Sequence, residues 1–104
     1  AFDASGTGSW SAVALAVNYA LSFRAAASSN AYAGEGHSYA LKATIEAANA
    51  QGHLFVASAG NKNKDASRAY PCAFAVENVL CVASTTPADV LEASCNFGNE
   101  TVDI

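Results

Sequence analysis

The stretch from His53 to Lys62, HLFVASAGNK, constrains the fold of this chain more than any other. Residues 54–57 are an uninterrupted apolar run of strand formers, which is typical of a strand buried in a sheet. Such a strand delivers the Asn61 amide to the carboxyl edge of the sheet, where open α/β folds bind ligands. An amide N–H held there can donate a hydrogen bond to a developing oxyanion. Gly60 and Asn61 also fit an ordinary turn, because both residue types tolerate positive φ.

Two segments that precede this strand show helical periodicity. Apolar residues recur at helical spacing over residues 10–21, with Ser9 or Ser11 available as the N-cap. A second helix is predicted to start near Ser38 and to end before Gly52, which stands where a glycine commonly terminates a helix.

Further strands are predicted at 25–31 and 79–83, and another is expected to begin at 102–104. The continuous apolar run at 79–83 is typical of a sheet that is covered on both faces. Residues 62–68 form a polar surface loop. Helices that alternate with buried strands predict an α/β protein with a mainly parallel sheet.

Size and composition exclude several classes of protein. The 104 residues are enough for one small domain, and 52% of them are hydrophobic. No apolar run reaches the roughly 20 residues of a membrane span. The formal net charge is −4 and the five basic residues are scattered, which argues against nucleic-acid binding. Because the chain has no Met, we expect an internal piece of a longer polypeptide.

The titratable and sulfur-containing residues form no obvious motif. Cys72, Cys81 and Cys95 lack metal-ligand spacing, so no metal site is predicted, and their pairing stays open. His37 and His53 have no nucleophile signature nearby, and we expect both to be structural. Gly6-Thr7-Gly8 before a helix leaves a nucleotide-binding α/β domain as an alternative. The dinucleotide fingerprint, however, requires a third glycine where this chain has Ser11.

Several motifs, in order, resemble those of the subtilisin-like serine proteases, and together they cover essentially the whole chain. The Asn61 motif is one of them. The matching segments are Ser5–Ser9, Ser29–Gly34, Ala40–Lys42 continuing to Ala59–Asn61, Tyr70–Ala73 with Asn78–Ala83, Leu91–Phe97 and Val102–Ile104.

The resemblance implies a three-layer subtilisin-like fold, of which residues 1–104 are the central part of a peptidase domain. The family's catalytic Asp and His precede this segment and its nucleophilic Ser follows it, so none has a match here. We therefore expect a serine endopeptidase in the full-length protein and no activity in this segment alone. A non-catalytic subtilisin-like protein that only binds peptides is the runner-up.

The resemblance also assigns roles to individual residues. Asn61 corresponds to the oxyanion-hole donor. An extended peptide substrate would lie between residues 6–8 and 32–34, and the pocket for the residue before the scissile bond would lie beside Asn61. The substrate-binding residues implied are Gly6, Thr7, Gly8, Trp10, Ala31, Tyr32, Ala33, Gly34, Ser58, Ala59, Gly60, Lys62 and Ala69. A more distant apolar pocket would involve Phe2, Trp10, Val13, Tyr32 and Leu41, of which Val13 and Leu41 fit the core equally well.

Further expectations follow from the family. Tyr70–Pro71 is expected to be cis. No cofactor is expected in this segment, although the family allows calcium in the full-length enzyme. The partners expected are a peptide substrate and the remainder of the chain's own peptidase domain, and secretion is favoured. The chain departs from the family at Ala31, Ala33 and Cys95, where Ser, Gly and an aromatic residue are usual, so its specificity is open.

Overall fold

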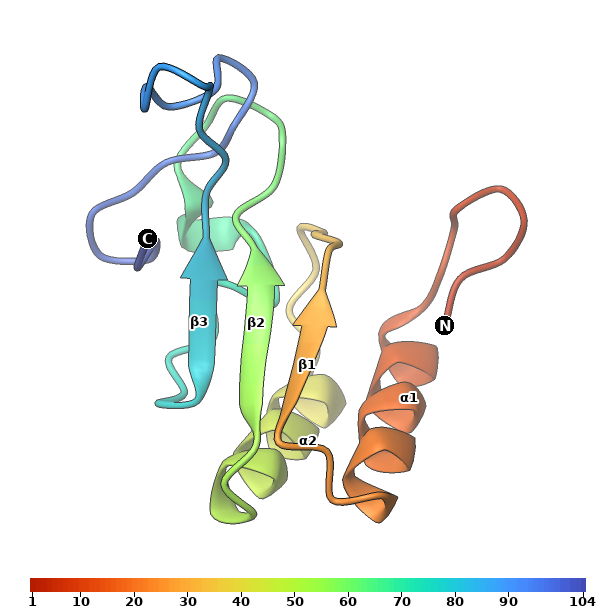
Figure 1. The fold of residues 1–104 in the computed structure, drawn as a ribbon. Coiled ribbons are helices and arrows are strands. Elements are labelled where there is room, and N and C mark those ends of the chain that lie inside the picture. Colours follow the sequence, from red (N-terminus) through yellow and green to blue (C-terminus); the bar gives the residue numbers. More distant parts are fainter.

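The computed structural model describes all 104 residues and forms an α/β unit (Figure 1). Two helices alternate with three strands, and a short 3₁₀ turn precedes the last strand. In chain order the elements are α1 (Trp10–Ser22), β1 (Ala27–Asn30), α2 (Tyr39–Ala50), β2 (Leu54–Ser58), η1 (Ala66–Arg68) and β3 (Val79–Val82). Neither helix has the length and apolarity that crossing a bilayer requires.

Serine side chains start both helices. The Ala12 N–H donates to Ser9 Oγ over 3.2 Å, and the Leu41 N–H donates to Ser38 Oγ over the same distance. Each contact satisfies one of the backbone donors that a helix N-terminus leaves without a partner. Gly52 has a φ of +74° just after α2, as its predicted role requires.

The three strands form a parallel sheet in the order β1-β2-β3. This arrangement confirms the α/β class with a parallel sheet. The expected strand at 102–104 is wrong, because these residues have no strand assignment. They nevertheless run beside β3: the Asp103 N–H donates to the Cys81 carbonyl and the Ala83 N–H donates to the Ile104 carbonyl.

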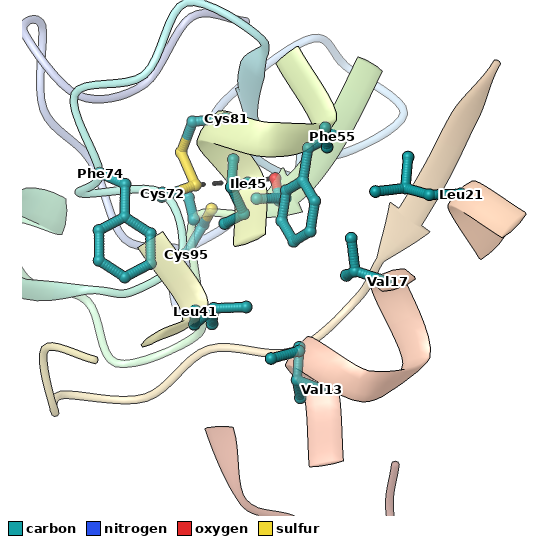
Figure 2. Packing of buried hydrophobic residues seen from close by; sticks show 14 residues of the cluster. Val13, Val17, Leu21, Leu41, Ile45, Phe55, Cys72, Phe74, Cys81 and Cys95 are labelled. Carbon is teal, nitrogen blue, oxygen red and sulfur yellow. Dashed lines mark hydrogen bonds between the residues drawn. A yellow bond between two sulfur atoms is a disulfide. The ribbon is translucent and has the colours of Figure 1, made fainter. Parts of the chain in front are cut away.

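The core lies between the helices and one face of the sheet (Figure 2). Val17 of α1, Leu41 and Ile45 of α2, and Phe55 of β2 are all buried there. The opposite face is only partly covered, since Leu54 of β2 is 41% exposed and Ala27 and Ser29 of β1, which pair with Leu54 and Val56, are exposed. The prediction of a sheet covered on both faces is therefore not met within residues 1–104.

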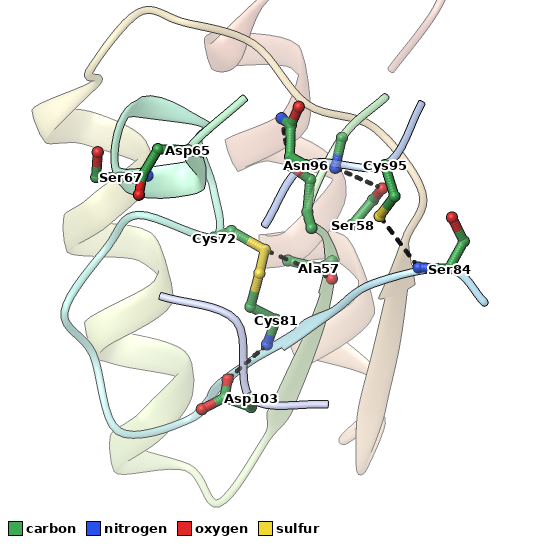
Figure 3. The surroundings of a disulfide bond; sticks show 12 residues. Ala57, Ser58, Asp65, Ser67, Cys72, Cys81, Ser84, Cys95, Asn96 and Asp103 are labelled. Carbon is green, nitrogen blue, oxygen red and sulfur yellow. Dashed lines mark hydrogen bonds between the residues drawn. A yellow bond between two sulfur atoms is a disulfide. The ribbon is translucent and has the colours of Figure 1, made fainter. Parts of the chain in front are cut away.

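A disulfide bond joins Cys72 to Cys81 and ties the turn after Pro71 to β3 (Figures 2 and 3). Cys95 is the free thiol. It is buried, and its sulfur accepts a hydrogen bond from the Ser84 N–H. The Tyr70–Pro71 bond is cis, as expected.

Candidate functional site

The loop that follows β2 is held in place by Asn96. This asparagine is only 3% exposed (Figure 3). Its Nδ2 donates to the Ala59 carbonyl over 2.8 Å, and its Oδ1 accepts from the Lys62 N–H over 2.9 Å. The Asn96 N–H donates to the Gly60 carbonyl. One buried side chain thus fixes the backbone on both sides of Asn61.

Position 60, where the backbone passes close to the Asn96 side chain, requires a glycine. Its φ is +94°, a conformation that other residues adopt only with strain. A Cβ at this position would lie 2.7 Å from Asn96 Nδ2. The glycine therefore allows the close approach that places Asn61 beyond the end of β2.

Asn61 itself is exposed, and its side chain makes no hydrogen bond within the chain. It lines two neighbouring cavities, of about 260 and 650 Å³, that share Ala31, Ser58 and Asn61. An amide that is fixed by its backbone and has no internal partner can donate to a bound group.

The larger of these cavities gathers most of the predicted site residues. The predicted residues that line it are Ala31, Tyr32, Ala33, Gly34, Ser58, Gly60, Asn61, Lys62 and Ala69. Sequence reasoning did not single out six residues that also line it, namely Glu35, Lys64, Asp65, Ser67, Arg68 and Asn96. These residues form no motif in the sequence, because tertiary packing alone brings residues 35, 64–68 and 96 to one cavity.

A third cavity, of about 500 Å³, neighbours the larger one, and Tyr32, Ala33 and Gly34 line both. Its opposite wall is formed by Gly6, Thr7 and Gly8. Phe2, Trp10 and Val13 also line it. The two segments that sequence reasoning placed on either side of a peptide thus face one cleft.

Two predicted residues are not at a cavity wall. Ala59 is fully buried in the core and lines none of these three cavities. Leu41 is likewise fully buried between α2 and the sheet, so the core interpretation holds for Leu41.

Backbone groups of residues 32–34 differ in whether they already form hydrogen bonds within the chain. Gly34 exchanges two hydrogen bonds with Tyr70, over 2.9 and 2.8 Å. The neighbouring Ala33 makes no hydrogen bond within the chain and is exposed. Its N–H and C=O are therefore free to pair with an added strand.

The loop that carries Gly6 to Gly8 is ordered by Asp3. One carboxylate oxygen of Asp3 accepts hydrogen bonds from the Ser5 and Thr7 N–H groups, both over 2.9 Å. These bonds, led by one from the Ser5 side chain, hold the pKa of Asp3 below its usual range. At the opposite wall, the Tyr32 hydroxyl donates to Asn30 Oδ1, and burial raises the pKa of Tyr32 to about 12.

Charged side chains meet across the larger cavity. Glu35 Oε1 lies 3.1 Å from Lys62 Nζ and 2.6 Å from Lys64 Nζ. The hydrogen bond from Lys64, followed by that from Lys62, lowers the pKa of Glu35 to about 2. Glu35 is therefore ionised at any pH near neutrality.

The chain contains one serine–histidine hydrogen bond, and it is structural. His53 Nε2 lies 2.9 Å from Ser28 Oγ, and Nδ1 lies 2.7 Å from the Ala25 carbonyl oxygen. His53 is 1% exposed and lines none of the three cavities, so a substrate could not reach it. His37 packs against Tyr39, Tyr70 and Phe74. No group of three or more His, Cys, Asp or Glu side chains lies close enough together to hold a metal ion.

Comparisons with known proteins find relatives of this chain in both sequence and fold. The model of the subtilase family (Peptidase S8) matches residues 2–104. Alkaline protease 1 of Emericella nidulans is 39% identical over 71 residues, which are 68% of this chain and 17% of that protein. The crystal structure of a cold adapted subtilisin-like serine proteinase superposes with a TM-score of 0.83 at 29% identity, covering 94% of this chain and 36% of that one. The chain thus spans well under half the length of these relatives.

Proposed function

This chain belongs to the subtilase family, and on that premise we propose that the full-length protein is a serine endopeptidase. Residues 1–104 would form part of its peptidase domain and supply the oxyanion-hole amide and the substrate-binding strands. The observation that carries the proposal is the convergence of Asn61, the exposed Ala33 backbone and the segment 6–8 on two neighbouring cavities that share residues 32–34.

Asn61 would act on the oxygen of the scissile carbonyl. When a nucleophile adds to that carbon, the oxygen becomes negative and moves out of the plane of the peptide. A fixed N–H donor that meets the oxygen only in this tetrahedral state lowers the barrier without tightening substrate binding. Asn61 suits this task because Gly60 and Asn96 fix its backbone while its amide has no internal partner.

The substrate would bind in extended form between the two walls of the cleft. The free N–H and C=O of Ala33 would pair with the substrate backbone, as in other cases of strand addition. The side chain before the scissile bond would then enter the larger cavity beside Asn61. Trp10, Val13 and Phe2 would receive an apolar side chain farther along the peptide.

The nucleophilic serine and its histidine base would come from parts of the peptidase domain outside residues 1–104. Ser28 and His53 cannot replace them, because His53 is buried away from the cleft. We therefore expect the 104-residue chain alone to be inactive. The Cys72–Cys81 disulfide supports secretion, since such bonds persist in oxidising compartments. Calcium in the full-length enzyme stays a proposal based on the family.

The test compares the full-length protein with residues 1–104 on casein and on a peptide anilide. We expect hydrolysis by the full-length protein, abolished by a serine-directed fluorophosphonate, and none by the shorter chain. A correctly folded full-length protein that binds peptides but neither hydrolyses them nor reacts with the fluorophosphonate would contradict the proposal. That result would favour a non-catalytic peptide-binding subtilase instead.

A further inference from the structure

The basic residues of this acidic chain gather at one place. Three of its five lysines and arginines, Lys62, Lys64 and Arg68, line the larger cavity beside Asn61, although the net charge of the chain is −4. All three are exposed on the loop between β2 and β3. The remaining two, Arg24 and Lys42, line none of the three cavities described.

The acidic side chains of the same cavity are already engaged. Glu35 contacts both lysines, and Asp65 accepts a hydrogen bond from the Ser67 N–H over 2.8 Å. Arg68 forms no ion pair within the chain, so its planar guanidinium is free for a bidentate contact with a carboxylate. Each lysine ammonium has three donor hydrogens, and the contact with Glu35 uses one of them.

We propose that this cavity selects an acidic side chain, Glu or Asp, in the peptide residue that precedes the scissile bond. The inference rests on the proposed endopeptidase function. Positive groups outnumber negative ones in the lining, and the spare donors of Lys62, Lys64 and Arg68 face the cavity from one loop. A lysine side chain of the substrate would instead meet three positive groups and only two carboxylates, each of which already accepts hydrogen bonds through one oxygen.

Glu35 would moderate this preference. It lines the same cavity and directly contacts the ammonium groups of Lys62 and Lys64. Removing its charge would leave both lysines available to the substrate carboxylate. Replacing a lysine would have the opposite effect.

The experiment measures kcat/KM of the full-length protein on three peptides that differ only in Glu, Gln or Lys before the scissile bond. We expect Glu to exceed Gln by about two- to fivefold, the upper part of the range of an exposed ion pair, and Lys to be the poorest. The Glu-to-Gln ratio should fall toward one in Lys64→Gln and Arg68→Gln and should rise in Glu35→Gln. Lys42→Gln is the matched control, because Lys42 pairs with Glu46 on α2 outside the cavity, and it should leave the ratio unchanged.

Two further conditions sharpen the test. The ratio should shrink in high salt, because exposed charges are screened. It should also shrink below about pH 4, where the substrate glutamate is protonated while Glu35 stays ionised.

The outcomes separate the two claims. Fluorophosphonate-sensitive cleavage with equal rates on Glu and Gln, or with lysine preferred, overturns the selectivity and leaves the peptidase proposal intact. A ratio that changes as much in Lys42→Gln as in Lys64→Gln also overturns it. Absence of cleavage of all three peptides overturns both.

Discussion

At the scale of single residues, the site depends on a buried asparagine that lies far from Asn61 in the sequence. Asn96 bonds to the backbone of Ala59, Gly60, Lys62 and Lys64 and thereby shapes the loop that displays Asn61. We expect Asn96 to be a positioning residue, because its side chain is buried beneath the loop and its polar atoms are all engaged with backbone groups.

The Asn96→Ala variant of the full-length protein tests this role. Leaving the buried backbone groups of the loop without partners should cost about 2–3 kcal/mol of unfolding free energy, measured by denaturant titration. Under conditions where the variant is folded, kcat should also fall, because Asn61 loses its fixed position and meets the transition-state oxygen less well. Asn96→Asp keeps the acceptor and loses the donor to Ala59. Its unfolding free energy should lie between those of the wild type and Asn96→Ala. A variant with wild-type stability and kcat would show that the loop is held by other contacts.

At the scale of elements, the helices and strands could be predicted because local signals agree with the fold. Ser9 and Ser38 mark the helix starts, and the apolar run at 54–57 marks β2. The loop at 62–68 was predicted only as polar and exposed. It contains a 3₁₀ turn with a fully buried Ala66, which depends on a contact with Phe97 that no local pattern encodes.

The Cys72–Cys81 disulfide supports the third strand. Closing a loop of roughly ten residues restricts the unfolded chain and contributes about 2–3 kcal/mol. The double variant Cys72→Ala, Cys81→Ala should therefore melt at a lower temperature in calorimetry. Reductant should lower the Tm of the wild type toward that of the double variant and leave the double variant itself unchanged. Equal melting temperatures of the two proteins without reductant would argue against a stabilising role.

At the scale of the whole molecule, family motifs predicted which segments meet, and the structure brings them together in one cleft. The charge pattern of the larger cavity could not be predicted, since Glu35 joins Lys62 and Lys64 only through tertiary packing. Ala59 is predicted at the site, but its side chain is fully buried in the core, and burial after the end of β2 also depends on tertiary packing. The apolar run at 79–83 predicted a sheet covered on both faces, but which segments cover each face depends on tertiary packing, and one face is only partly covered.

The central claim is that Asn61 acts in the transition state, and the kinetics of Asn61→Ala in the full-length protein test it most directly. We expect kcat to fall by about 10²–10³, a magnitude carried over from removal of such a donor in a subtilisin. KM and the melting temperature should stay close to wild type, because Asn61 is exposed and fills no core volume. Asn18→Ala, at an exposed position on α1, serves as the control. An unchanged kcat in Asn61→Ala would contradict the claim and leave Asn61 as an ordinary turn residue.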